Sequence, residues 1–242
     1  MEPGLSPRNP RVVTASRLQR AEERSRRGLT LLEGPRLLEE AIVAKADLRE
    51  VFALSGDAMA ADWGRAAPLT LVGEEALRRL SSTRTPQSPV AVMAIPPAEL
   101  LPPRSLLVAW GISDPGNLGT IIRSAAAFGL DVGVAATSAD PWSPKVLRAG
   151  MGGHFHTNVA RVEAVGDLGV TLVAAVMKGG VAPDQLPAGR LAILIGSEAH
   201  GLPRDLVDQA ATRISIPMLA PTESLNAAVA AGIIAYEAFH RT

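Results

Sequence analysis

The feature that most constrains the fold is an alternation, in the second half of the chain, between short apolar runs and segments with a helical pattern. Runs such as "LLVAW" and "RLAILIG" are continuously apolar, which is typical of strands that are buried on both faces. This pattern predicts an α/β fold with a mostly parallel sheet and helices on both of its faces. The expected strands are 106–110, 131–136, 157–162, 171–176, 190–196 and 213–217, and the expected helices are 118–128, 144–150, 203–210 and about 224–240.

The first half of the chain shows the same alternation on a smaller scale and ends in "PPAELLPPRS", with four prolines in ten residues. Such a segment neither continues a helix nor lies inside a sheet, which is typical of a linker. We therefore expect a first domain at 1–97, a linker at 98–103 and a second domain at 104–242. The expected helices of the first domain are 12–27, 35–44 and 74–81, and its expected strands are 29–34, 49–54, 68–73 and 89–95.

Composition excludes several classes of protein. The chain has no cysteine, which excludes disulfides, thiol nucleophiles and cysteine zinc sites. Its four histidines do not recur with carboxylates at ligand spacing, so we expect no metal site. No apolar run approaches the roughly 20 residues that cross a bilayer, and the N-terminus has no apolar signal region. We expect a cytoplasmic protein that makes no membrane contact.

The formal net charge is zero, which argues against a protein that coats nucleic acid indiscriminately. Between residues 8 and 27, however, seven arginines stand against only two glutamates, and on a helix they would form a basic face. A solvated helix surface and a phosphate-binding surface both remain open for this segment. The seven are Arg8, Arg11, Arg17, Arg20, Arg24, Arg26 and Arg27.

Ligands of parallel sheets bind beyond the carboxyl ends of the strands. The loops to consider are therefore 111–117, 175–180, 196–203 and 217–224. The first is a turn by composition, and the helix after it carries Arg123 off its apolar stripe. An arginine in that position is most often simply solvated.

The other two segments are "LIGSEAHGLP", with two glycines around Glu198, and "ISIPMLAPTESLNAAVAAGIIAYEAF". The helix at the end of the second is rich in alanine and glycine, so another backbone must pack close to it, from the same chain or from a second subunit. Asn226 lies in this crowded segment and needs hydrogen-bond partners, because an unsatisfied buried amide costs about 1–3 kcal/mol.

Taken together, "DPGNLGTIIRSAAAFG", "LIGSEAHGL" and "ISIPMLAPTESLNAAVAAG" resemble, in order and separation, the three motifs of the SpoU (TrmH-like) family of SPOUT RNA 2′-O-ribose methyltransferases. The resemblance covers about 104–242. The first domain, with "LLEGPRLLEEA", is similar to the L30e-like RNA-binding domain that often precedes this catalytic domain. The resemblance implies a deep C-terminal trefoil knot, S-adenosylmethionine as cofactor and a homodimer.

Residue roles follow from the same resemblance. It implies that the cofactor is bound around Ala175, Gly196, Ile216, Met218 and Leu225, and that the catalytic set is Arg123, Asn117, Glu198, Ser224 and Asn226. The pKa of a guanidinium lies above about 12, which makes it a poor general base. We therefore hypothesise that Arg123 binds the phosphate beside the target ribose and stabilises the developing alkoxide, while Glu198 orients Asn117. The candidate RNA-binding residues are Arg8, Arg11, Arg17, Arg20, Arg24 and Arg27.

Other functions stay open at this point. The RNA-binding domain favours ribosomal RNA over transfer RNA as substrate, because such domains bind structured or single-stranded elements. A tRNA methyltransferase and a knotted RNA-binding dimer without activity are the alternatives. A nucleotide-dependent enzyme is disfavoured, since neither Gly-x-Gly-x-x-Gly nor a phosphate loop follows the strands.

Overall fold

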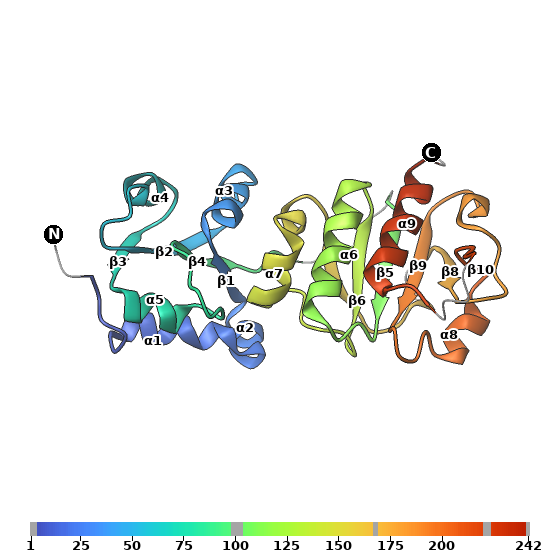
Figure 1. The fold of residues 1–242 in the computed structure, drawn as a ribbon, viewed down its shortest axis with the longest axis horizontal. Coiled ribbons are helices and arrows are strands. Elements are labelled where there is room, and N and C mark those ends of the chain that lie inside the picture. Colours follow the sequence, from blue (N-terminus) through green and yellow to red (C-terminus); the bar gives the residue numbers. More distant parts are fainter. Residues whose placement is uncertain (1–3, 98–103, 167–168, 220–223, 241–242) are drawn as a thin grey trace. The chain divides into compact units, whose positions relative to one another are not determined.

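The computed structural model describes residues 4–97, 104–166, 169–219 and 224–240, so the expected linker at 98–103 lies outside the described residues. Contacts within the chain divide it into two compact units. The N-terminal unit is Met1–Pro97 together with Trp142–Phe155, and the C-terminal unit is Ala98–Pro141 together with His156–Thr242. Figure 1 labels the helices and strands and colours them by their order along the chain.

The N-terminal unit is built on a four-stranded sheet with the order β1-β4-β2-β3. Strand β4 runs antiparallel to both β1 and β2, whereas β2 and β3 are parallel. The four strands expected from the sequence are all present. They are β1 (Leu29–Glu33), β2 (Leu48–Leu54), β3 (Leu69–Val72) and β4 (Val90–Ala94). The helices are α1 (Pro10–Ser16), α2 (Ala21–Arg27), α3 (Pro35–Val43), α4 (Ala60–Ala66), α5 (Glu74–Leu80) and α7 (Pro144–Gly150), with 3-10 turns at Arg17–Gln19 and Gly153–Phe155.

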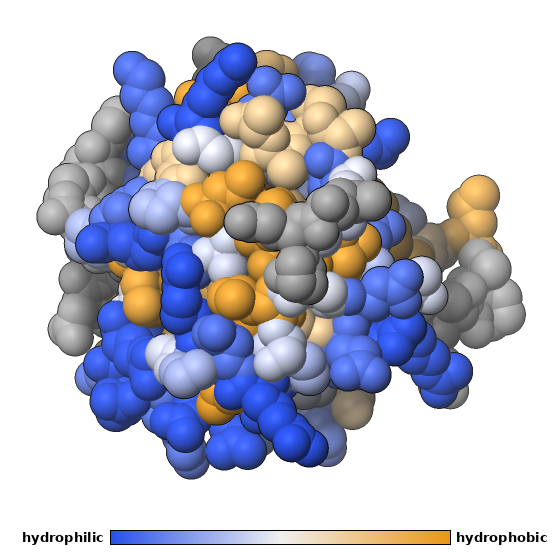
Figure 2. All heavy atoms as spheres, turned by 90° about the vertical axis from the view of Figure 1, so that its left-hand side faces the viewer, coloured by the Kyte–Doolittle hydropathy of each residue, from blue (hydrophilic) through white to orange (hydrophobic). Residues whose placement is uncertain are grey.

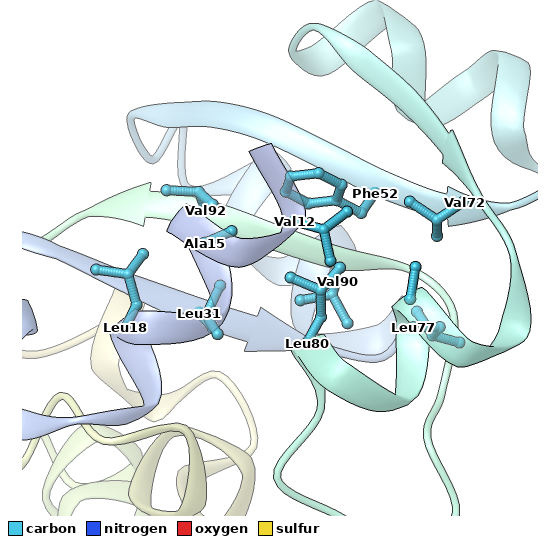
Figure 3. Packing of buried hydrophobic residues seen from close by; sticks show 11 residues of the cluster. Val12, Ala15, Leu18, Leu31, Phe52, Val72, Leu77, Leu80, Val90 and Val92 are labelled. Atoms are coloured by element: carbon cyan, nitrogen blue, oxygen red, sulfur yellow. The ribbon is translucent and has the colours of Figure 1, made fainter. Parts of the chain in front are cut away.

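The core of this unit lies between the sheet and the helices α1 and α5. Figure 3 shows Val12 of α1 and Leu77 of α5 beside Phe52 and Val90 of the strands. Phe52 is fully buried, and burying a phenylalanine side chain stabilises the fold by about 1.5–3 kcal/mol. The apolar residues of the N-terminal segment therefore face the sheet and cover it.

The single helix expected at 12–27 is wrong, because the segment is divided. Helix α1 ends at Ser16, a 3-10 turn follows, and Arg20 is extended, with φ −91° and ψ 134°. The side chain of Arg24 folds back over this break and donates hydrogen bonds to the carbonyl oxygens of Leu18 and Gln19, both at 2.8 Å. These bonds satisfy backbone acceptors that a continuous helix would have paired.

Residues 142–155 pack within the N-terminal unit, although the sequence placed them in the second domain. The hydroxyl of Thr30 in β1 donates to the carbonyl oxygen of Trp142 at 2.6 Å, and Arg148 of α7 pairs with Glu33 at 3.2 Å. Helix α7 thus covers β1. The sequence also gave no sign of α4, which is short and contains a glycine; its Trp63 is 3% exposed.

The C-terminal unit contains a six-stranded sheet with the order β10-β8-β9-β5-β6-β7, in which all neighbouring strands are parallel. The predicted parallel sheet is therefore confirmed. Its strands are β5 (Leu106–Trp110), β6 (Asp131–Ala135), β7 (Val159–Val162), β8 (Thr171–Ala175), β9 (Leu191–Gly196) and β10 (Thr212–Ile214). The chain runs outward from β5 through β6 and β7, and the later strands lie on the other side of β5. The strand order reverses between β5 and β9, and ligands of such sheets bind beside this reversal.

Helices cover both faces of the sheet, as expected. Helix α6 (Pro115–Ala127) packs on β5 and β6, and beside it lies α9 (Ala227–His240), as Figure 1 shows. On the other face, Leu206 of α8 (Arg204–Gln209) packs with Leu106 and Leu194. A Cβ added to Gly232 of α9 would lie 3.5 Å from the hydroxyl oxygen of Ser124 in α6. One close neighbour of the small-residue helix is therefore α6 of the same chain.

Figure 2 shows one face of the molecule, on which hydrophilic side chains surround a smaller hydrophobic area. Such a mixture is ordinary for the surface of a folded protein. Within the described parts of the chain, no helix combines the length and the apolar character needed to cross a membrane.

Candidate active site

The loop that follows β5 runs directly into helix α6 and does not form a separate turn. The carboxylate of Asp114 caps α6 by accepting a hydrogen bond of 2.8 Å from the backbone N–H of Asn117. The next residue is Pro115, which is well suited to the first position of a helix because its missing N–H is not needed there. The turn expected at 114–117 is thus the first turn of α6, and the Asp-Pro pair is the signal for it. Gly129 follows the helix with φ +69°, the left-handed conformation in which many helices end.

The second loop folds tightly back on itself at the end of β9. The N–H of Gly201 donates to the carbonyl oxygen of Ser197 at 2.8 Å, and Gly201 has φ +64°. A Cβ at Gly196 would overlap the backbone of Gly201 and Leu202. Only glycine fits at position 196, and the resulting turn presents Glu198 at the carboxyl end of the sheet.

Three predicted site residues from three different loops form one hydrogen-bonded chain. The side-chain amide of Asn117 donates to Oε1 of Glu198. Its Oδ1 accepts a hydrogen bond of 3.0 Å from Nδ2 of Asn226. Because the carboxylate accepts from the nitrogen of Asn117, the oxygen of that amide is turned toward Asn226.

Asn226 also fixes the start of the last helix. Its Oδ1 accepts hydrogen bonds from the backbone N–H groups of Ala228 and Val229, at 2.9 and 3.2 Å. Helix α9 accordingly begins at Ala227, three residues later than expected from the sequence. The oxygen and the nitrogen of the Asn226 amide therefore both have hydrogen-bond partners, which this residue was expected from the sequence to need.

A cavity of about 340 Å³ lies beside this chain, at the carboxyl ends of β8 and β9. All five residues proposed to hold the cofactor line it, and so do Glu198 and Ser224. The five are Ala175, Gly196, Ile216, Met218 and Leu225. Sequence reasoning missed other lining residues, among them Met177, His200, Val207, Ala227, Ala230 and Ile234. The last three recur at helical spacing on α9, and this spacing is the signal by which they could have been found.

Arg123 lies apart from these groups. It is exposed on α6, it does not line the cavity, and among the described residues it makes no hydrogen bond or ion pair. The structure therefore brings together Asn117, Glu198 and Asn226, and places Ser224 at the same cavity, but leaves the guanidinium of Arg123 open to solvent.

The arginines near the N-terminus do not form the uniform basic face expected from the sequence. Arg24 is 3% exposed and its guanidinium is used inside the fold, so it was wrong to place it on a surface. Arg11 pairs with Glu50 at 2.5 Å, and Arg27 pairs with Glu23 at 2.9 Å. The remaining candidates are exposed, namely Arg8, Arg17 and Arg20.

A further arginine of the same segment is also engaged. Arg26 donates to Glu23, and this hydrogen bond lowers the pKa of the Glu23 carboxyl. The carboxylate therefore stays charged and offsets part of the local positive charge. Elsewhere among the described residues, no group of three or more histidine, aspartate or glutamate side chains is arranged to bind a metal.

Comparison with protein families gives two matches that together span most of the chain. Residues 104–236 match the SpoU rRNA Methylase family, and residues 9–91 match the MRM3-like substrate binding domain. The 23S rRNA (guanosine(2553)-2′-O)-methyltransferase RlmP of Bacillus subtilis is 31% identical over 239 residues, which cover 96% of each protein. An uncharacterized tRNA/rRNA methyltransferase of Synechocystis is 32% identical, over 96% of this chain and 92% of the relative.

Solved structures give the same match. The SpoU methyltransferase AviRb from Streptomyces viridochromogenes, in complex with the cofactor AdoMet, superposes with a TM-score of 0.86 at 28% identity, over 97% of this chain and 98% of that one. An RNA 2′-O ribose methyltransferase superposes with a TM-score of 0.80 at 30% identity, over 98% and 97% of the two chains.

Proposed function

Because the chain belongs to the SpoU rRNA methylase family, we propose that it transfers a methyl group from S-adenosylmethionine to a ribose 2′-hydroxyl of ribosomal RNA. The observation that carries this function to particular residues is the hydrogen-bonded chain of Asn117, Glu198 and Asn226 at the rim of an apolar cavity. Ribosomal RNA is the substrate named for the Bacillus subtilis relative, which matches 96% of this chain.

The cavity suits the cofactor in size and chemistry. Its volume of about 340 Å³ falls within the range of about 300–1,000 Å³ that is typical of small-molecule sites. Ile216, Met218 and Leu225 offer apolar surface to an adenine ring and a methionine stem, and Gly196 lines the cavity without a side chain. When bound, S-adenosylmethionine supplies an electrophilic methyl group. It carries no phosphate, so no phosphate-binding loop is required.

The protein's own groups divide the remaining work. A guanidinium group is positively charged in proteins, and the exposed guanidinium of Arg123 would bind the phosphate beside the target ribose. There it would stabilise the negative charge that develops on the 2′-oxygen. Glu198 is a positioning residue that holds the amide of Asn117, and the 2′-hydroxyl proton passes to water or to a phosphate oxygen.

The C-terminal helix supports a homodimer. Val229, Ile233 and Tyr236 are 51%, 37% and 48% exposed and recur at a spacing of four and three residues on one side of α9. Apolar side chains grouped in this way mark a surface that another protein covers. A second copy of the chain is the proposed partner. We also propose the knotted C-terminal segment that the family implies, and location in the cytoplasm, where bacterial ribosomal RNA is found.

The role of Arg123 is tested with purified Arg123→Ala and Arg123→Lys proteins. We expect Arg123→Ala to bind S-adenosylmethionine like the wild type in calorimetry and to lose methylation by roughly 100-fold or more. Arg123→Lys keeps the charge but not the two-pronged donor geometry, so it should recover part of the rate. Arg204→Ala is the matched control, because Arg204 is also an exposed helix arginine of the C-terminal unit. Near wild-type methylation by Arg123→Ala would refute the assignment.

The substrate is tested by mapping ribose methylation in cells with and without the protein. Loss of one 2′-O-methyl mark in ribosomal RNA is the expected result. Loss of a transfer RNA mark instead would leave the reaction in place and overturn the substrate.

A further inference from the structure

The N-terminal unit contains a cavity of about 1000 Å³ that is separate from the candidate active site. It lies between the start of α3, the loop 81–88 and the end of α7. Its wall includes Arg36, Gln87, Ser88, Arg148 and Met151. None of these residues takes part in binding the cofactor or in the methyl transfer proposed above.

One wall of this cavity is fixed by a buried carboxylate. The side chain of Glu33 is 4% exposed and accepts hydrogen bonds from the hydroxyls of Ser81 and Thr83, at 2.5 and 2.9 Å. It also accepts from the backbone N–H of Gln87 at 3.4 Å and pairs with Arg148 at 3.2 Å. These bonds connect the loop 81–88 to the end of β1 and to α7. Rigid support of this kind is what a binding site needs.

Gln87 presents its side-chain amide at the cavity. Gly34 has φ +97°, and a Cβ there would lie 2.9 Å from Oε1 of Gln87. A glycine at position 34 thus leaves room for this amide over the start of α3. Within the described residues the Gln87 side chain makes no hydrogen bond, so its donors and its acceptor are open to a ligand.

The remaining groups indicate the ligand class. Arg36 and Arg148 can bind phosphate oxygens, and Met151, which is 49% exposed, offers apolar surface to the face of a base. Glu39 and Glu40 line the same cavity and would oppose a bare polyanion, but they can accept from the amino group of a base. This mixture fits a single unpaired nucleotide better than a stretch of duplex backbone.

We propose that this cavity binds one unpaired nucleotide of the RNA substrate, with Gln87 contacting the base edge and Arg36 contacting a phosphate. The proposal rests on the RNA methyltransferase function above. It also accounts for RNA recognition by a unit whose N-terminal arginines are largely paired or buried.

The test uses the full-length protein and an in vitro transcript of 23S rRNA. Affinity for the RNA is measured without cofactor at several salt concentrations for Arg36→Ala, Gln87→Ala and the control Arg65→Ala. Arg65 is an exposed arginine of the same unit and lies in α4. We expect Arg36→Ala and Gln87→Ala each to weaken RNA binding about tenfold. Arg36→Ala should also lower the salt slope by about one, because it removes a phosphate contact, whereas Gln87→Ala should leave that slope unchanged.

Affinity for S-adenosylmethionine and the kcat at saturating RNA should stay at wild-type values in all three variants. Wild-type RNA affinity in Gln87→Ala would overturn the nucleotide site, and so would equal losses in the Arg65→Ala control. Failure of the wild-type protein to methylate RNA is a separate outcome. It would refute the proposed reaction, while the binding assay would still decide whether the cavity binds RNA.

Discussion

At the scale of single residues, hydrogen bonds set the orientation of one amide at the candidate site. Glu198 accepts from Nδ2 of Asn117 and thereby turns the oxygen of that amide toward Asn226. Glu198→Gln keeps an acceptor at this position, whereas Glu198→Ala removes it. We therefore expect Glu198→Gln to keep the methylation rate within a few-fold of wild type. Glu198→Ala should lose roughly 5- to 150-fold, which corresponds to about 1–3 kcal/mol for the lost hydrogen bond.

Single-turnover methylation assays with saturating cofactor would measure both rates. Glu163→Ala serves as the control, because Glu163 is an exposed carboxylate of the same unit. Equal losses in Glu198→Gln and Glu198→Ala would mean that the charge of Glu198, and not its hydrogen bond to Asn117, supports the reaction.

At the scale of elements, Asn226 connects the start of α9 to Asn117 of α6 at the candidate site. Its oxygen caps the helix and its nitrogen bonds to Asn117. Asn226→Asp keeps the capping oxygen and loses the donor, so it should unfold near the wild-type denaturant midpoint but lose methylation. Asn226→Ala loses both functions and should also be destabilised by about 0.5–2 kcal/mol. Urea unfolding and the methylation assay, run on the same samples, separate the two effects.

The contrary results are equally distinct. If Asn226→Asp methylated RNA at the wild-type rate, the bond to Asn117 would have no role in the reaction. If Asn226→Ala were as stable as the wild type, the cap would contribute nothing to the helix.

The elements also show what the sequence could and could not predict. Buried parallel strands such as β5 and β9 were predictable, because a continuous apolar run between glycine or proline turns fits little else. The break at Arg20 was not, since the residues from Ala21 to Arg27 read as ordinary helix, and the side chain of Arg24 satisfies the carbonyl oxygens that the break leaves unpaired.

The same distinction holds at the site. The five lining residues proposed to hold the cofactor were found because a resemblance assigned them to motifs, and parallel strands bring the ends of such motifs together. The bond between Asn226 and Asn117 spans 109 residues of sequence, and the choice of partner depends on how α9 packs against α6. The burial of Arg24 likewise depends on tertiary packing, so a count of arginines along the chain overstated the basic surface.

At the scale of the whole molecule, the exposed side of α9 predicts a dimer. Ile233 lies between Val229 and Tyr236 on that side, and Tyr236 stacks edge-on against Phe128 at 5.8 Å between ring centroids. A charge placed in the middle of a buried apolar interface is strongly unfavourable. We expect the wild type to sediment as a dimer and Ile233→Glu to sediment as a monomer with reduced methylation.

Analytical ultracentrifugation over a range of concentrations measures this directly. Glu237→Gln, on the same helix, is the matched control for a surface change and should remain dimeric. A wild type that sediments as a monomer would rule out the proposed partner, and a dimeric Ile233→Glu would move the interface away from α9.

Residues 142–155 pack within the N-terminal unit, and this limits where the chain can be truncated. A fragment that stops at residue 97 would lack α7, leaving β1 without the helix that covers it and Glu33 without Arg148. A buried carboxylate that loses its counterion is costly. The N-terminal unit is therefore not completed by residues 1–97 alone: a stable fragment has to carry α7 with it, or supply that helix through a short engineered connection.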